Sequence, residues 1–117
     1  MPRADLVVIG AGPAGAATAI RAARAGVDVV VFDKAPYGRD KVCGDGLTPR
    51  AVGALEDLGI DLGEAHLIDG LRMKAHKVER LLPWPETDRY PAHGAVWPRR
   101  RFDKALIDAA SEAGAKV

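Results

Sequence analysis

Four residues in the first third of the chain have the types and spacing of a dinucleotide-binding turn followed by an acid. Gly10, Gly12 and Gly15 form a G-x-G-x-x-G pattern, and Asp33 follows a later apolar run. Gly10 allows a tight turn, Gly12 lets a pyrophosphate approach the backbone, and Gly15 lets a helix pack closely on a strand. Asp33 would accept hydrogen bonds from an adenosine ribose, which disfavours a 2′-phosphate and leaves FAD and NAD open. The alternative is a tight turn without a ligand.

The residues around this pattern predict the elements of one βαβ unit. Residues 5–9 are a short β-branched run closed by glycine, which favours a buried strand. Residues 13–25 are alanine-rich, start with a proline and are followed by Gly26, so they predict a helix. Residues 27–32 predict a second buried strand. This order favours parallel pairing with a right-handed crossover, and the fold class is α/β and Rossmann-like.

The single cysteine lies in the stretch KVCGDG, which offers a second kind of chemistry. Arg39 and Lys41 are cationic neighbours that would favour the thiolate form of Cys43. Gly44 and Gly46 would permit close approach of a flat ring and a turn geometry closed to other residues. The thiol of Cys43 could tune such a ring or supply a proton. The alternative is that Cys43 is a small buried hydrophobe.

The rest of the chain predicts further elements of the same domain. Residues 34–47 are loop, and residues 49–58 are a helix that starts after a Thr-Pro cap. Residues 70–98 form a small insertion of antiparallel strands, and residues 102–113 form a last helix. A further strand begins at residues 115–117, so we expect the chain to be the front, truncated portion of a larger protein, with residues 1–117 forming the N-terminal part of a dinucleotide-binding domain.

The strand insertion has two features of its own. Residues 71–76 alternate apolar and polar side chains, which predicts a strand with one solvated face. Prolines at positions 83, 85 and 91 limit residues 81–97 to short or edge strands.

Composition excludes several classes of function. The chain has 117 residues, 48% of them hydrophobic, and a net charge of +1, so charge gives no reason to expect nucleic acid as a partner. One cysteine cannot form an internal disulfide or a cysteine-rich zinc site, and the three histidines have no metal-ligand spacing. No signal core and no run of about 18 apolar residues is present. These features favour a cytoplasmic setting.

Three stretches resemble the geranylgeranyl reductase family of flavoproteins, which has a para-hydroxybenzoate-hydroxylase-like fold. They are GAGPAGAATA, VVVFDK and RDKVCGDGLTPRAV. The similarity is closest to the branch that reduces the isoprenoid tail of menaquinone, and it covers nearly the whole chain. The resemblance implies FAD bound through the glycine turn, with Ala14 near the pyrophosphate, Asp33 on the ribose and Arg99 in contact with FAD. It also implies that Cys43 lies against the flavin ring.

The full set of implied FAD-binding residues follows from this resemblance. It comprises Gly10, Gly12, Pro13, Ala14, Gly15, Asp33, Lys34, Cys43, Gly44, Asp45, Gly46 and Arg99.

The resemblance also implies a reaction, the reduction of carbon–carbon double bonds in a prenyl chain. Cys43 is the candidate catalytic residue, because its thiol could supply the proton. The partners implied are a prenyl-chain substrate and an unidentified reduced electron donor. Peripheral membrane association would run through the portion of the family that this chain lacks, and the chain alone is expected to be an incomplete enzyme. Two alternatives remain: an FAD-dependent aromatic monooxygenase or halogenase of the same fold, and a non-catalytic module that binds FAD or another adenine nucleotide.

Overall fold

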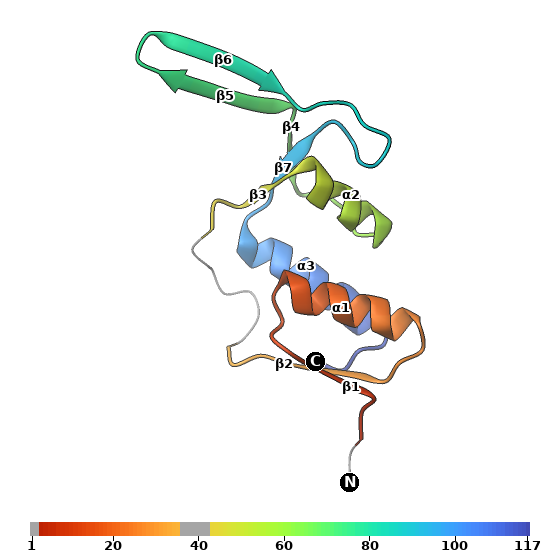
Figure 1. Cartoon of the computed structure of the whole chain (residues 1–117). Helices are drawn as coiled ribbons and strands as arrows, with labels where there is room; N and C mark the ends of the chain where they lie inside the picture. Colours follow the sequence, from red (N-terminus) through yellow and green to blue (C-terminus); the bar gives the residue numbers. More distant parts are fainter. Residues whose placement is uncertain (1–2, 36–42) are drawn as a thin grey trace. The chain divides into compact units, whose positions relative to one another are not determined.

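The computed structural model describes residues 3–35 and 43–117 (Figure 1). The chain divides into two compact units. The first unit contains residues 1–42 and 98–117, and the second contains residues 43–97. The second unit is therefore inserted between the two halves of the first.

The first unit contains the predicted βαβ arrangement. Strands β1 (Leu6–Ile9) and β2 (Val29–Phe32) pair in parallel, and helix α1 (Pro13–Arg24) connects them. Helix α3 (Arg99–Glu112) packs beside α1 (Figure 1). Lys116 forms a parallel bridge with Val30, where the sequence predicts the start of a further strand.

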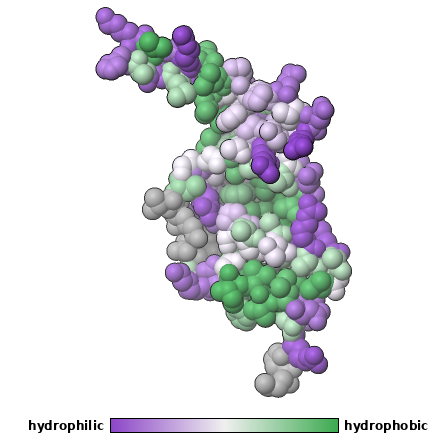
Figure 2. All heavy atoms as spheres, in the orientation of Figure 1, coloured by the Kyte–Doolittle hydropathy of each residue, from purple (hydrophilic) through white to green (hydrophobic). Residues whose placement is uncertain are grey.

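One face of the β1–β2 sheet forms the core of the first unit. Val8, Val29 and Val31 are buried on this face, and the helices cover it with small and branched apolar side chains. The buried apolar helix residues are Ala16, Ala19, Ile20, Phe102, Leu106, Ile107 and Ala110. The opposite face is open, because Val7, Ile9 and Phe32 are 52%, 79% and 56% exposed. Figure 2 shows apolar side chains gathered over this part of the surface.

The second unit consists of a short sheet, one helix and a hairpin. Strand β7 (Gly94–Val96) pairs antiparallel with β3 (Gly46–Leu47) on one side and with β4 (His66–Ile68) on the other. Helix α2 (Pro49–Asp57) packs on this sheet. Its start is fixed by the predicted cap, because Thr48 Oγ1 accepts a hydrogen bond from Ala51 N at 3.2 Å.

The hairpin departs from the sequence prediction. Strands β5 (Gly70–Ala75) and β6 (Val78–Pro83) pair antiparallel in the predicted insertion, but the prediction of a single solvated face is wrong. Leu71 and Met73 are 47% and 58% exposed. The alternating apolar and polar side chains give the hairpin one apolar face, but no described part of the second unit covers that face.

Two other boundaries differ from the predicted ones. Helix α3 begins at Arg99, three residues before the predicted start, and its first turns contain a bidentate ion pair between Arg99 and Asp103. Strand β4 occupies a region for which the sequence predicts no element. Among the described residues, no helix is long and apolar enough to cross a membrane.

Gly15→Ala is expected to destabilise the first unit. A Cβ at position 15 would overlap the carbonyl oxygen of Gly10 and would lie 3.2 Å from Val8 Cγ1. The turn would have to move away from α1, at a cost of about 1–3 kcal/mol of unfolding free energy. Denaturant unfolding followed by circular dichroism measures this loss.

Gly12→Ala is the matched control. Nothing lies within 4 Å of a Cβ built at Gly12, and its φ of −76° suits any residue. The expected loss of stability is below about 1 kcal/mol. Equal losses for the two variants would contradict the close packing of α1 on the turn.

Candidate functional site

The glycine turn between β1 and α1 has the geometry of a phosphate-binding turn. Gly10 has a φ of +107°, a conformation that other residues rarely adopt, and its N–H donates to Phe32 O at 2.7 Å. Gly15 has no room for a side chain beside Gly10 O, whereas the space around Gly12 is open. The turn is thus tight on the sheet side and accessible at Gly12.

The N-terminus of α1 is free of side chains that compete with an anion. Gly12 is the N-cap, no side chain makes a capping hydrogen bond, and no acidic residue lies in the first turn. The first-turn N–H groups of a helix lack intrahelical partners and carry partial positive charge. Pro13 occupies the first position, where its missing N–H costs nothing. This end of α1 can therefore hold a phosphate oxygen near Ala14.

Asp33 joins the end of β2 to the glycine turn. Its Oδ2 accepts a hydrogen bond from Ala11 N at 2.7 Å, and its Oδ1 accepts one from Ala35 N at 2.9 Å. Sequence reasoning assigned Asp33 only to a ribose, so the structure adds a second role, which is to fix the turn. A carboxylate has roughly four acceptor sites, so two backbone bonds are compatible with further bonds to a ribose. Lys34 follows as an exposed residue.

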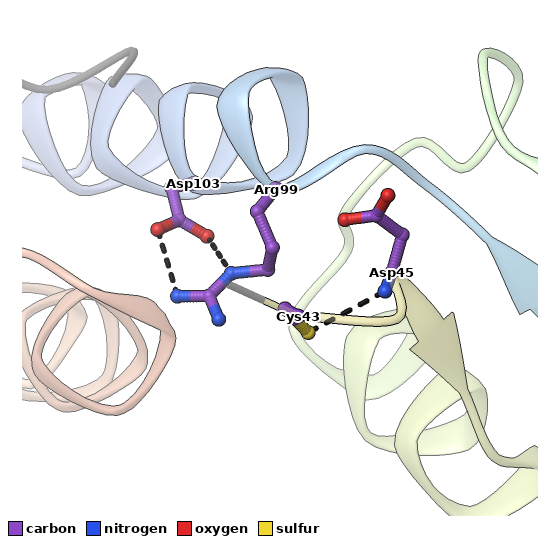
Figure 3. Close-up of polar contacts among 4 residues, drawn as sticks. All are labelled: Cys43, Asp45, Arg99 and Asp103. Atoms are coloured by element: carbon purple, nitrogen blue, oxygen red, sulfur yellow. Dashed lines mark hydrogen bonds and ion pairs between the residues drawn. The ribbon is translucent and has the colours of Figure 1, made fainter. Parts of the chain in front are cut away.

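Cys43 and its neighbours lie at the start of the second unit. Cys43 is a free, exposed thiol, so its interpretation as a small buried hydrophobe is wrong for this structure. Asp45 N donates to Cys43 Sγ at 3.4 Å (Figure 3), and Trp97 N donates to Asp45 O at 2.9 Å. Since Trp97 is buried at 2% exposure, Asp45 links the cysteine turn to the core of this unit. Arg39 and Lys41 lie outside the described residues, so the expected thiolate stays a prediction.

The left-handed residue of this turn is an aspartate. Asp45 has a φ of +59°, whereas Gly44 and Gly46 are not in the left-handed region. The expectation that these glycines supply a geometry closed to other residues is therefore wrong. Aspartate tolerates this conformation better than most residues because its short polar side chain can bond locally. The expectation that Gly44 and Gly46 leave room for a flat ring agrees with the structure, because nothing lies within 4 Å of a Cβ built at either residue.

Arg99 forms a buried ion pair that sequence reasoning missed. Its Nε and Nη2 donate to Asp103 Oδ1 and Oδ2 at 2.7 and 2.9 Å (Figure 3). The two side chains are only 17% and 8% exposed. The i, i+4 spacing of an arginine and an aspartate was visible in the sequence, but spacing alone does not reveal burial. Asp103 fixes the guanidinium of Arg99, so it is a positioning residue.

The structure thus brings together the predicted residues in two separate groups. In the first unit, Gly10, Gly12, Gly15 and Asp33 form one continuous turn. In the second unit, residues 43–46 form the cysteine turn. Among the described residues, no group of three or more His, Cys, Asp or Glu side chains is placed to hold a metal ion.

Comparison with known proteins decides which dinucleotide this turn serves. A family model described as an FAD binding domain matches residues 3–117. The chain belongs to this family of FAD-binding domains. The prediction of FAD is confirmed, and the choice that the glycine turn left open between FAD and NAD is resolved.

Curated relatives agree with the resemblance found in the sequence. The chain is 49% identical over 119 residues to a menaquinone reductase of Mycolicibacterium smegmatis, an alignment that covers 98% of this chain and 28% of that protein. It is 40% identical to digeranylgeranylglycerophospholipid reductase 1 of Methanopyrus kandleri, with 97% and 28% covered. The chain therefore spans less than a third of the length of these relatives.

Solved structures confirm the Rossmann-like FAD-binding fold. A flavoprotein/dehydrogenase from Cytophaga hutchinsonii superimposes with a TM-score of 0.86 at 28% identity, covering 97% of this chain and 29% of that one. A geranylgeranyl bacteriochlorophyll reductase-like protein from Thermoplasma acidophilum gives 0.78 at 29% identity, with 97% and 29% covered. The flavin-dependent halogenase CmlS gives 0.83 at 25% identity, with 100% and 22% covered.

Arg99→Ala is expected to destabilise the first unit strongly. The substitution leaves the Asp103 carboxylate buried without the guanidinium that it contacts at 2.7 Å. Removing one partner of a buried pair costs about 3–5 kcal/mol. The free energy of unfolding in urea measures the effect, and Asp103→Asn in the Arg99→Ala background is expected to recover part of the loss.

Lys104→Ala is the control for this pair on the same helix. Lys104 and Asp108 have the same spacing and a similar 2.7 Å contact, but they are 56% and 45% exposed. An exposed pair of this kind contributes about 0.3–0.5 kcal/mol. Similar losses for the two alanine variants would contradict the structural importance of the buried pair.

Proposed function

We propose that the chain is the FAD-binding portion of a flavin-dependent reductase that saturates carbon–carbon double bonds of a prenyl chain. The observation that carries this proposal is the 49% identity over 98% of the chain to a protein named menaquinone reductase. The 40% identity to a digeranylgeranylglycerophospholipid reductase supports it, because both names describe reductions of prenylated lipids. Identity to the halogenase CmlS is lower, at 25%, which favours the reductase over the halogenase alternative.

The residues of the glycine turn fit FAD. The open space at Gly12 and the uncapped N-terminus of α1 suit a pyrophosphate, and Asp33 lies at the end of β2 with its carboxylate at the turn. Gly10, Pro13, Ala14 and Gly15 would hold the phosphates, Asp33 and Lys34 the ribose end, and Arg99 a further polar group of FAD. When bound and reduced, FAD supplies the hydride for the double bond.

The cysteine turn would supply the second component of the reaction, a proton. Cys43 Sγ is exposed and held by the N–H of Asp45 at 3.4 Å. The hydrogen bond from Trp97 N to Asp45 O keeps the turn in place. Open space at Gly44 and Gly46 would let a flat ring lie against the backbone. In this proposal Cys43 holds a proton at Sγ and gives it to the prenyl carbon that does not receive the hydride.

A chimera tests the function directly. This chain replaces the matching portion of the Mycolicibacterium smegmatis menaquinone reductase, and the hybrid is incubated without oxygen with chemically reduced FAD and menaquinone. The expected product is a quinone that has gained two hydrogens in its prenyl chain, detected by mass spectrometry. A folded, FAD-containing hybrid that yields no reduced product would contradict the proposal.

Cys43→Ala in the same hybrid tests the proton step. The expected result is retention of FAD with a fall in kcat of about 100-fold or more, as for loss of a general acid. Gly63→Ala, which lies outside both turns, is the control for nonspecific loss. Unchanged kcat in Cys43→Ala would remove Cys43 from the reaction. Oxygen consumption coupled to substrate hydroxylation or halogenation would instead favour the alternative activity.

A further inference from the structure

A pocket on the second unit contains two arginines that the FAD site does not use. It lies between α2 and the segment that precedes β7, and its volume is about 310 Å³. That value is at the lower end of the roughly 300–1,000 Å³ found for small-molecule pockets. The lining residues are Arg50, Gly53, Ala54, Asp57, Arg89 and Tyr90.

Close packing of the chain on α2 builds this pocket. Gly53 is buried, and a Cβ built there would lie 2.8 Å from Tyr90 Cβ, so only glycine lets the two segments approach. Thr87 Oγ1 accepts hydrogen bonds from Arg89 N at 3.2 Å and from Tyr90 N at 3.4 Å. These contacts fix the backbone from which Arg89 and Tyr90 extend, so the pocket is a built feature of the unit.

Two charged residues of the pocket lie at the ends of α2 where they destabilise the helix. Arg50 lies in the first turn of α2 and Asp57 ends the helix, which has no acidic residue in its first turn and no basic residue in its last. Cations are favoured at the C-terminus of a helix and anions at its N-terminus, so both charges oppose the helix dipole. Charges placed against a local preference are expected mainly at functional sites.

The two guanidinium groups also lack protein partners in the described part of the chain. Neither the side chain of Arg50 nor that of Arg89 forms an ion pair or a hydrogen bond with another described residue. An anion near Arg50 and Arg89 would compensate the positive charge at the start of α2. It would also gain from the helix dipole itself.

We propose that this pocket binds a phosphate group, separately from the FAD site. The planar guanidinium groups of Arg50 and Arg89 match phosphate oxygens in bidentate geometry, and the Tyr90 hydroxyl is a further donor. Gly53 and Ala54 line the pocket between these groups. Asp57 opposes the anion, so neutralising Asp57 strengthens binding. The phosphate belongs either to a soluble compound or to a lipid headgroup, which the same residues would recognise.

Calorimetric titration of the full chain with inorganic pyrophosphate, at constant ionic strength and with FAD already added, tests the proposal. The affinity is expected to fall about tenfold or more in Arg50→Gln and in Arg89→Gln. Arg80→Gln removes the same charge from the exposed hairpin strand β6 and is expected to leave the affinity unchanged. Asp57→Asn is expected to raise it, whereas Glu64→Gln, an exposed acid outside the pocket, is not.

Vesicles that contain phosphatidate distinguish the two sources. Sedimentation of the wild type but not of Arg89→Gln with these vesicles assigns a lipid headgroup. Binding of pyrophosphate without vesicle binding assigns a soluble phosphate compound. Absence of both, or equal effects of Arg80→Gln and Arg89→Gln, overturns the proposal. FAD absorbance retained by every variant shows that the FAD site is intact, so failure here is separate from failure of the reductase function.

Discussion

The hydrogen bond from Ala11 N–H to Asp33 Oδ2, 2.7 Å long, connects the glycine turn after β1 to the residue that follows β2. Ala11 lies between Gly10 and Gly12, and Asp33 directly follows β2. The bond therefore fixes the turn at the edge where parallel strands β1 and β2 end. Gly15 also packs closely against Gly10, and this contact sets how near α1 can lie to the sheet. The position of the α1 N-terminus depends on both constraints.

Helix α3 extends this arrangement from the far end of the chain. It packs beside α1 and buries Phe102, Leu106 and Ala110, although the second unit separates the two helices in sequence. The Arg99–Asp103 pair is buried at the start of α3. Burial of a paired charge is weak evidence for stability. A guanidinium held at a fixed place is, however, well suited to contact a charged cofactor, which the family resemblance also implies for Arg99.

Local patterns predicted the βαβ elements of the first unit and helix α2 of the second unit well. The glycine spacing, the β-branched runs and the Thr48 cap each depend on residues close in sequence, and β1, α1, β2 and α2 lie where these patterns place them. The second role of Asp33 was not predictable, because it depends on the distance between two loop backbones. The burial of Asp103 depends on how α3 packs and is equally invisible in sequence. Asp45 took the left-handed conformation that the pattern assigned to its glycine neighbours.

The central claim is that the glycine turn tied by Asp33 is an FAD site, and visible absorbance after desalting tests it most directly. The purified chain is mixed with FAD, desalted, and compared with Asp33→Ala treated in the same way. We predict that the wild type keeps a structured flavin spectrum and that Asp33→Ala loses most of it, because the variant lacks both the turn contact and the ribose acceptor. A colourless wild type, or equal flavin retention in the two proteins, would contradict the account.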